Sequence, residues 1–299
     1  MKKVLFVMNP KSGKATIKNA LFEILDLFTK NNFITTVYAT QKSKDAIEII
    51  EKVGEEYELI VCSGGDGTLD EVVTGILNAK LNTPIGYIPA GSTNDFAKSL
   101  GIPSRKMEAA KLIVHGKEFQ CDIGVFNQSY FVYIAAFGIF TDVSYSTPQS
   151  TKNLIGHMAY LLEGVKSLSL LQSYHLIVEH DEEVIEDDFI FGMITNSISV
   201  GGFKSFRGQK VQFDDGLFEV LLIRMPKNPL ELQSILGALI LNDINKDYMC
   251  FFKTSELTIH SEQEVSWTLD GEFGGLHKTV LIQNKQKEIT ILRNMDLHT

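Results

Sequence analysis

The chain has no excess of positive charge and no long apolar run. Its 299 residues include 37 Asp and Glu against 28 Lys and Arg, which gives a formal net charge of −9. This balance, without a run of basic residues, argues against a nucleic-acid-binding protein. No segment approaches the ~20 apolar residues that a membrane-spanning helix needs. Any contact with a membrane is therefore expected to be peripheral.

Cysteine is also scarce. Cys62, Cys121 and Cys250 are odd in number, lie far apart and form no Cys-x-x-Cys motif, which is typical of reduced, buried thiols in a cytoplasmic protein. The apolar run at 4–8 ends at Asn9, too early for a signal peptide. The seven histidines show no His-Glu-x-x-His spacing, so a zinc hydrolase is not expected.

A glycine-rich stretch at 64–68 (Gly-Gly-Asp-Gly-Thr) follows a predicted buried strand over 57–62 and precedes a predicted helix. In such a turn, backbone N–H groups can approach an anion closely, and the helix N-terminus adds partial positive charge. Thr68 and Glu71 fit a capping box, which predicts that the helix begins near Leu69.

Three acids, Asp66, Asp70 and Glu71, lie in or beside this turn. They would repel phosphates unless a divalent cation stood between them, and Mg²⁺ prefers one or two carboxylates plus phosphate oxygens. The stretch therefore predicts a site for a nucleotide with Mg²⁺. The alternative is a tight turn followed by acids that only favour the helix dipole.

Short apolar runs alternate with helical patterns up to about residue 115. The predicted strands cover 3–8, 34–39, 57–62 and 84–89, and the predicted helices include 17–28, 44–53 and 107–114. This alternation predicts a doubly wound parallel sheet, in which ligands bind beyond the carboxyl ends of the strands. Polar turns follow two further strands, at 9–14 and at 90–97. The first lacks the Walker spacing, and the second can equally be no more than a capped helix.

From about Phe119 the pattern changes to strands joined by turns. Predicted strands cover 119–126, 130–137, 175–179, 189–195, 217–223, 256–260, 265–269, 280–283 and 288–292. We therefore expect an α/β domain at 1–125 and a mostly antiparallel β domain at 126–292, a β-sandwich or a strongly curved sheet. Two helical patterns, at 154–171 and 230–241, could contact lipid, although packing on their own sheet is favoured.

Taken together, the motifs resemble those of bacterial diacylglycerol kinase family lipid kinases, whose catalytic domain is similar to that of eukaryotic diacylglycerol and sphingosine kinases. The matching residues are Asn9-Pro10-x-Ser12-Gly13, Thr40 ahead of Asp45-Ala46, Gly64–Thr68, Gly91-x-x-Asn94-Asp95-Phe96-Ala97, Asp214–Phe218 and Asp270-Gly271-Glu272. They extend over nearly the full length in the expected order. Gly-Gly-Asp-Gly-Thr alone is shared with NAD kinases and, nearly, with phosphofructokinases, so the complete set carries the resemblance.

The resemblance implies the following roles. ATP would contact Asn9, Pro10, Lys11, Ser12, Gly13, Thr40, Gly64, Gly65, Asp66, Gly67, Thr68, Leu69, Asp70 and Ser92. Asp66 would help to hold the catalytic Mg²⁺, and Asp95 would support the site. Glu272 matches the proton acceptor, and Asp215 matches a structural Mg²⁺ ligand completed by the carbonyls of Gln212 and Leu217. The family also implies a phosphofructokinase/NAD-kinase-like first domain to which residues 293–299 return, and an active site between the domains.

The chain departs from the family at two positions. Asp70 stands where Asn is common, which adds a negative charge close to the nucleotide and leaves room for weaker ATP affinity or a different metal preference. Ser92 stands where Thr is usual, which keeps the hydroxyl.

The leading hypothesis is a kinase that uses ATP and Mg²⁺ to convert diacylglycerol to phosphatidic acid. It would be cytoplasmic and peripheral to the inner face of the membrane, and its partners would be ATP, a membrane lipid and, as one option, a second copy in a homodimer. Alternatives are a kinase for a sphingoid base, ceramide or phosphatidylglycerol, and a nucleotide-binding lipid sensor without turnover. Without the family, Asp270-Gly271-Glu272 reads as a hairpin turn and Asp214-Asp215-Gly216 as another turn.

Overall fold

The computed structural model describes residues 1–13, 17–139, 171–196, 199–200, 203–204, 212–241 and 243–294. The chain divides into two compact units. Unit 1 comprises Met1–Cys121 and Lys287–Thr299, and unit 2 comprises Asp122–Gln286. The boundaries expected from the sequence, 125 and 292, lie a few residues later.

Unit 1 alternates strands and helices. Its elements are β1 (Lys2–Met8), α1 (Ile17–Lys30), β2 (Phe33–Ala39), α2 (Asp45–Val53), a 3-10 turn (Gly54–Glu56), β3 (Leu59–Gly64), α3 (Asp66–Asn78), β4 (Ile85–Pro89), α4 (Asp95–Ser99), α5 (Lys106–His115) and the first residues of β5 (Lys117–Phe126). The strands pair in the order β2-β1-β3-β4, all parallel. The last residues of β15 (Glu272–Arg293) add a further parallel strand, because Ile291 pairs with Ile85.

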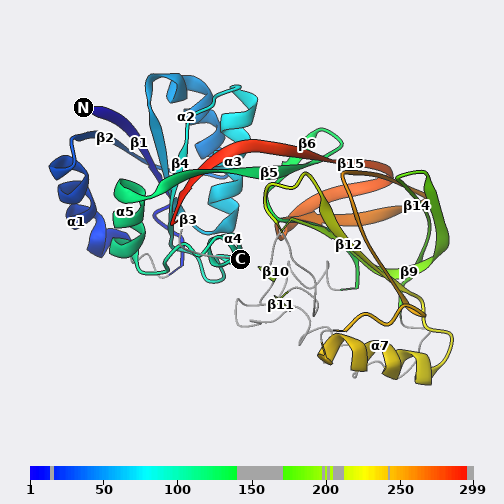
Figure 1. The fold of residues 1–299 in the computed structure, drawn as a ribbon. Coiled ribbons are helices and arrows are strands. Elements are labelled where there is room, and N and C mark those ends of the chain that lie inside the picture. Colours follow the sequence, from blue (N-terminus) through cyan, green and yellow to red (C-terminus); the bar gives the residue numbers. More distant parts are fainter. Residues whose placement is uncertain are drawn as a thin grey trace. The chain divides into compact units, whose positions relative to one another are not determined.

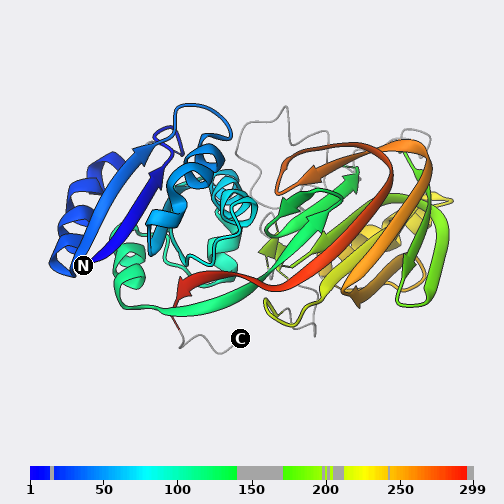
Figure 2. The same ribbon diagram turned by 90° about the horizontal axis from the view of Figure 1, so that it is seen from above.

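Helices cover both faces of this parallel sheet. Helices α1 and α5 pack together on one side of the strands, and α2 and α3 pack together on the other (Figure 1, Figure 2). Strands β3 and β4 are buried along their whole length, as expected of parallel strands covered on both faces. Edge strand β2 is partly exposed.

The strand order places two loops at one point of the sheet. The chain passes from β1 outward to β2 and then returns to β3 on the other side of β1. Strands β1 and β3 are neighbours, with Met8 beside Ser63, so the loops that follow them begin side by side. In open α/β sheets, ligands bind where the strand order reverses in this way.

Unit 2 is mostly antiparallel. Its described elements are the last residues of β5, β6 (Ser129–Phe131), β7 (Ile134–Gly138), β8 (Tyr174–His180), β9 (Glu183–Thr195), β10 (Ser199–Val200), β11 (Phe203–Lys204), β12 (Phe218–Arg224), α7 (Pro229–Leu241), β13 (Met249–Thr254), β14 (Glu256–Leu269) and β15 up to Gln286. The segments predicted at 256–260 and 265–269 form the single strand β14. Those at 280–283 and 288–292 are both part of β15.

The main sheet of unit 2 is one continuous hydrogen-bonded path, and the sequence predicts a β-sandwich or a strongly curved sheet. The order is β13-β12-β9, then β7 and β8 end to end, then β14 and β15, with β5 and β6 beyond. Phe131 on β6 nevertheless stacks on Phe218 on β12, with ring centroids 5.6 Å apart. These strands lie near opposite ends of the path, so the sheet curls around a single core.

The strand predicted over 130–137 is divided into β6 and β7. The Asp270 carboxylate accepts hydrogen bonds from the N–H groups of Val132 (2.6 Å), Tyr133 and Ile134 (both 3.0 Å). The apolar run suggests one strand, but these N–H groups bind a side chain instead of a neighbouring strand. Strand β6 then pairs with β5, and β7 pairs with β9 and β14.

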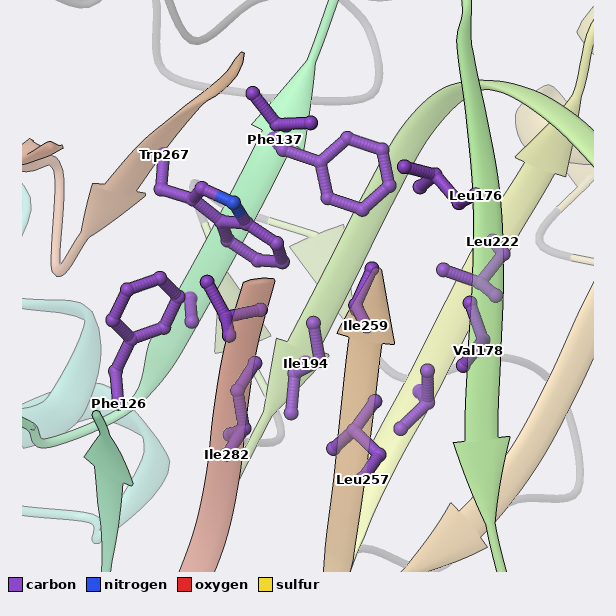
Figure 3. Close-up of a cluster of buried hydrophobic side chains, with 14 of the residues drawn as sticks. Phe126, Phe137, Leu176, Val178, Ile194, Leu222, Leu257, Ile259, Trp267 and Ile282 are labelled. Carbon is purple, nitrogen blue, oxygen red and sulfur yellow. The ribbon is translucent and has the colours of Figure 1, made fainter. Parts of the chain in front are cut away.

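The core of unit 2 is rich in aromatic side chains. Trp267, the only tryptophan of the chain, is 1% exposed. Its ring centroid lies 5.0 Å from that of Phe126 and 4.9 Å from that of Phe137 (Figure 3). Aliphatic side chains from β8, β9, β12, β14 and β15 complete the cluster. These contacts join both ends of the curled sheet.

One of the two predicted apolar helices is described. Helix α7 matches the pattern at 230–241 and buries Leu232, Ile235, Leu236 and Leu239, as the favoured interpretation requires. The pattern at 154–171 lies almost entirely outside the described residues. Within the part of the chain that the structure describes, no helix is long and apolar enough to cross a membrane.

We predict that Phe137→Ala destabilises unit 2 by about 3–5 kcal/mol, because it removes a fully buried ring that packs against Trp267 and Tyr174. The measurement is denaturant unfolding followed by Trp267 emission. Phe22→Ala is the matched control, since Phe22 is 82% exposed, and it should change stability by less than about 0.5 kcal/mol. Equal stabilities for the two variants would contradict the packing described here.

Candidate functional site

The loop after β1 is tied to the loop after β3. The Asn9 N–H donates to the Ser63 carbonyl (2.9 Å), and the Asn9 side-chain amide donates to Thr68 Oγ1 (3.3 Å). Asn9 Oδ1 also accepts from the Lys11 N–H (2.9 Å). Asn9 therefore holds the polar turn 9–13 beside the glycine-rich turn, as expected if both contact one ligand.

A third loop, after β4, approaches the glycine-rich turn through its backbone. A Cβ added at Gly91 would lie 2.5 Å from the Gly65 Cα, so only glycine allows this approach. The Ala90 N–H donates to the Gly64 carbonyl (2.7 Å). The predicted residues of these loops are thus brought together by main-chain contact.

Asn94 shapes the loop after β4. Its side chain accepts from the Gly91 N–H and donates to the Gly91 carbonyl, both at 2.9 Å. Its backbone φ of 49° is left-handed, which asparagine tolerates better than most residues. Tyr87, which the sequence analysis did not single out, donates from its buried hydroxyl to the Gly64 carbonyl (3.3 Å). In the sequence, the only sign of this contact is that Tyr87 lies in the predicted strand 84–89, directly before the loop.

The helix after the glycine-rich turn begins earlier than the capping box predicts. Helix α3 starts at Asp66 with Gly65 as its N-cap, and no side chain caps it. Thr68 lies inside the first turn, where its N–H bonds to the Gly65 carbonyl (3.1 Å) and its hydroxyl accepts from Asn9. The prediction of a start near Leu69 is therefore wrong. The first turn of an α-helix leaves N–H groups without an acceptor within the helix, and in α3 this turn consists of residues of the motif itself.

Glu71 does not face the glycine-rich turn but binds the start of another helix. Its carboxylate accepts from the N–H groups of Lys44 (2.8 Å) and Ala46 (3.3 Å), at the start of α2. The other half of the predicted capping box thus stabilises a different helix. Of the three acids considered together in the sequence, Glu71 has a structural role, and Asp70 is half-buried in α3.

Asp66 and Asp95 lie together. Asp66 Oδ2 accepts from the Asp95 N–H and from the Thr93 hydroxyl, both at 3.2 Å. Asp95 is buried, and one of its oxygens lies 3.2 Å from Lys98 Nζ. Burial, with a smaller contribution from the neighbouring Asp95 charge, raises the pKa of Asp66 above its ordinary value, and the hydrogen bonds to the carboxylate only partly oppose this.

The remaining oxygen of Asp66 fits a metal ligand. Among the residues that the structure describes, Asp66 Oδ1 is buried and has no hydrogen-bond partner. A buried carboxylate oxygen that accepts no hydrogen bond can bind a cation. Proteins usually supply one or two carboxylates to a Mg²⁺ site. No cluster of three or more His, Cys, Asp or Glu able to hold a metal occurs in the described ranges.

Thr40 and Asp45 lie at the end of β2, next to the same edge of the sheet. Thr40 is buried, and its N–H and hydroxyl bond to the Met8 carbonyl (2.9 and 3.4 Å). Asp45 accepts from the Gln41 N–H (2.7 Å) and the Tyr38 hydroxyl (3.0 Å). Of the other predicted ATP contacts, Lys11, Gly13 and Ser92 are exposed, which leaves them accessible to a ligand.

In unit 2, the turn that carries Asp215 is held by ionic contacts. Asp215 Oδ1 accepts from the Leu217 N–H (3.1 Å), and Oδ2 lies 3.6 Å from Lys253 Nζ. The same ammonium is 2.7 Å from the buried carboxylate of Glu219, whose pKa burial raises to about 7. The predicted ligands at Asp215 and Leu217 thus share one turn, and Gln212 is exposed just before it.

Glu272 follows a two-residue hairpin turn between β14 and β15. Leu269 pairs with Glu272, and Asp270 and Gly271 both have positive φ, as a tight hairpin requires. The hairpin interpretation of this motif is therefore correct, and Asp270 is more than a turn residue because its carboxylate holds 132–134. Glu272 itself is exposed at the end of the hairpin.

We predict that Asp66→Asn does not destabilise the ligand-free protein. The raised pKa means that the folded state holds the Asp66 proton more tightly than the unfolded state does, so wild-type stability falls as pH rises through the interval above about 3.8. The advantage of the variant should be absent below that pH and should grow as the pH rises above it. Thermal unfolding in the presence of a chelator, from pH 3.5 to 7.5, measures this difference in stability between the variant and the wild type.

Glu71→Gln is the comparison variant. It weakens a carboxylate that accepts two backbone hydrogen bonds, so it should lower stability at neutral pH. The opposite ranking of the two variants would contradict these assignments.

The chain is similar to known diacylglycerol kinases. Residues 3–126 match the family model of the diacylglycerol kinase catalytic domain. A diacylglycerol kinase of Bacillus subtilis (strain 168) is 31% identical over 278 residues, which cover 92% of this chain and 91% of the relative. One from Staphylococcus carnosus (strain TM300) is 33% identical over 276 residues, with 92% and 90% covered.

Solved structures show the same fold. A crystal structure of a diacylglycerol kinase from Bacillus anthracis str. Sterne is 24% identical, covers 98% of this chain and 97% of its own, and superposes with a TM-score of 0.78. A second crystal structure from that strain gives a TM-score of 0.85, with 98% and 96% covered. The family resemblance inferred from the sequence is confirmed, and the chain belongs to the diacylglycerol kinase family of ATP-dependent lipid kinases.

Proposed function

We propose that the protein transfers the γ-phosphate of ATP, with Mg²⁺, to the hydroxyl of diacylglycerol and so forms phosphatidic acid. The observation that supports this most is the meeting of three polar loops beside the strand-order reversal, with Asp66 half-buried among them and its buried Oδ1 without a hydrogen-bond partner among the described residues. Phosphoryl transfer asks a protein mainly to position reactants and to neutralise charge. Unit 1 would then be the nucleotide-binding domain, of the doubly wound phosphofructokinase/NAD-kinase-like type, and unit 2 the β-sandwich domain.

ATP would bind through main-chain amides. The turn at 9–13 and the start of α3 supply N–H groups, and a 13-residue helix adds partial positive charge at its N-terminus. The close approach of Gly65 and Gly91 leaves no side chain between the two loops. Thr40 and Ser92 would add hydroxyl contacts, and Asp70 would place a negative charge nearby.

Mg²⁺ would be held by Asp66, with Asp95 beside it. When bound, the ion would neutralise charge on the phosphates during transfer. Asp95 fixes the orientation of the Asp66 carboxylate through its own N–H (3.2 Å). A second, structural ion would take Asp215 and the carbonyls of Gln212 and Leu217. Lys253 already lies 3.6 Å from the Asp215 carboxylate, so this second ion would compete with an internal cation.

Glu272 would accept the proton of the lipid hydroxyl. A neutral alcohol is a poor nucleophile, so a carboxylate within hydrogen-bond reach of it is useful. The hairpin fixes the backbone of Glu272 through the pairing with Leu269 and the three hydrogen bonds to Asp270, while its side chain stays exposed. The substrate would be met at the membrane surface, with the enzyme bound peripherally.

We predict that Glu272→Gln lowers phosphate transfer to diacylglycerol by at least about 10²-fold, because it removes the proton acceptor. ATP binding, measured by calorimetry, should remain within about twofold of wild type. Glu262→Gln, an exposed glutamate on the neighbouring strand β14, is the control and should retain activity. Wild-type rates in the Glu272 variant would remove this residue from the base role.

The acceptor is tested with a panel of lipids. Transfer of labelled phosphate from ATP is measured with diacylglycerol, a sphingoid base, ceramide and phosphatidylglycerol in mixed micelles. We expect product with diacylglycerol. Product with another lipid alone would reassign the substrate, and tight ATP binding without any product would indicate a nucleotide-binding sensor.

A further inference from the structure

Lys253 and Glu219 form an ion pair across two neighbouring strands of unit 2. Glu219 on β12 lies directly opposite Lys253 on β13, and residues that are directly opposite in an antiparallel pair share a face of the sheet. The neighbours of Glu219 along β12, Phe218 and Val220, belong to the core cluster, so the pair lies on the other face. The Lys253 ammonium is 2.7 Å from the Glu219 carboxylate. The register of two strands therefore fixes this pair.

The charge of Glu219 is compensated by this ammonium. The Glu219 side chain is only 4% exposed, and apart from the ammonium its two oxygens have no hydrogen-bond partner among the described residues. A buried charge that loses its partner is strongly destabilising, whereas the replacement of both partners by neutral groups can cost little. Any process that draws the ammonium away from Glu219 therefore carries the cost of an unpaired buried carboxylate.

The same ammonium faces the carboxylate of Asp215. Lys253 Nζ lies 3.6 Å from Asp215 Oδ2, while Asp215 Oδ1 accepts the Leu217 N–H (3.1 Å). Both oxygens of Asp215 are thus engaged within the chain. A divalent ion at Asp215 would either lie beside a positive charge, which lowers its affinity, or displace the ammonium and leave Glu219 unpaired.

The backbone of the turn that carries Asp215 is also held by contacts from within unit 2. Asp122 donates its N–H to the Phe213 carbonyl and accepts the Gly216 N–H at Oδ2, both at 2.7 Å. The Gln286 side-chain amide donates to the Asp214 carbonyl (3.0 Å). The turn therefore has internal partners on both sides of Asp215, and its shape does not require a metal ion as the organising contact.

We infer that Lys253 occupies the cation position of unit 2 and prevents Asp215 from binding a divalent ion tightly, so that this turn does not depend on Mg²⁺. Glu219 is the positioning residue that anchors the ammonium there. The inference rests on the proposed function only for the expectation of a second ion at Asp215. It decides the competition between that ion and the internal cation in favour of Lys253, and it assigns the Mg²⁺ requirement of the enzyme to the nucleotide site.

The direct test is Mn²⁺ binding measured by electron paramagnetic resonance, without nucleotide, at about pH 8, where carboxylates are ionised. Mn²⁺ accepts the same oxygen ligands as Mg²⁺. Every protein carries Asp66→Asn, so that unit 1 does not contribute. Adding Lys253→Met to this parent should tighten binding at least about tenfold, because it removes a positive charge next to Asp215. Lys253→Arg keeps the charge and should stay within about twofold of the parent.

Three further variants complete the test. Lys246→Met removes an exposed lysine from the loop before β13, and its affinity should stay within about twofold of the parent. Lys253→Met/Asp215→Asn should lose the gain, which assigns the bound ion to Asp215. Lys253→Met/Glu219→Gln removes both charges of the buried pair and should also bind at least about tenfold more tightly than the parent. It replaces Lys253→Met if that variant does not fold.

Equal Mn²⁺ affinities with and without Lys253 would overturn the inference, and so would a gain that persists in the Asp215 variant. Trp267 emission shows whether each variant is folded. The proposed function is judged separately, because these measurements contain no nucleotide and no lipid. A wild-type protein that phosphorylates none of the lipids would refute the proposed function, and the metal affinities would still decide on Lys253.

Discussion

The turns of both units depend on side-chain oxygens that accept hydrogen bonds from backbone N–H groups. A buried N–H without a partner costs about as much as a lost hydrogen bond, so each reversal of the chain needs an acceptor. Asp270 supplies one for three consecutive residues, Glu71 for the start of α2, and Asn94 for the loop after β4. Two of these three acceptors are carboxylates, which join segments that are far apart in the sequence.

This use of carboxylates separates structural acids from candidate functional ones. The carboxylates of Glu71 and Asp270 accept hydrogen bonds from backbone N–H groups, and we assign a structural role to both. Asp66 accepts only at Oδ2, while Oδ1 is buried without a hydrogen-bond partner among the described residues. Glu272 is exposed one residue beyond a turn that Asp270 fixes. Asp66 and Glu272, which we propose for chemistry, thus each keep a carboxylate oxygen that the described hydrogen bonds leave open.

The sequence predicts unit 1 well because periodicity there reports burial on both faces of a parallel sheet, and each motif follows a strand. It fails where a long-range side chain decides local structure. Nothing within 130–137 reveals that Asp270, more than 130 residues later, takes up the N–H groups of 132–134 and divides the strand. Likewise, Thr68 and Glu71 fit a capping box because its pattern is local, whereas their actual partners, Asn9 and the start of α2, are far away in the sequence. Gly274 is an extra residue of β15 between the partners of Trp267 and Thr268. This bulge depends on how β15 pairs with β14, which the residues of β15 alone do not specify.

The hairpin at 269–277 shows why structure and proposed function are hard to separate in this family member. Asp270 ties the turn to β6 and β7, Gly271 allows its left-handed backbone, and the Gly274 carbonyl with His277 fixes the bulge. These contacts are all structural, and together they fix the backbone of the hairpin that carries Glu272. A general base needs a fixed position relative to its substrate, and a lipid is fixed only through the bilayer that contains it. A carboxylate on a flexible loop would lose that position, so the proposed role of Glu272 depends on the contacts that hold this hairpin.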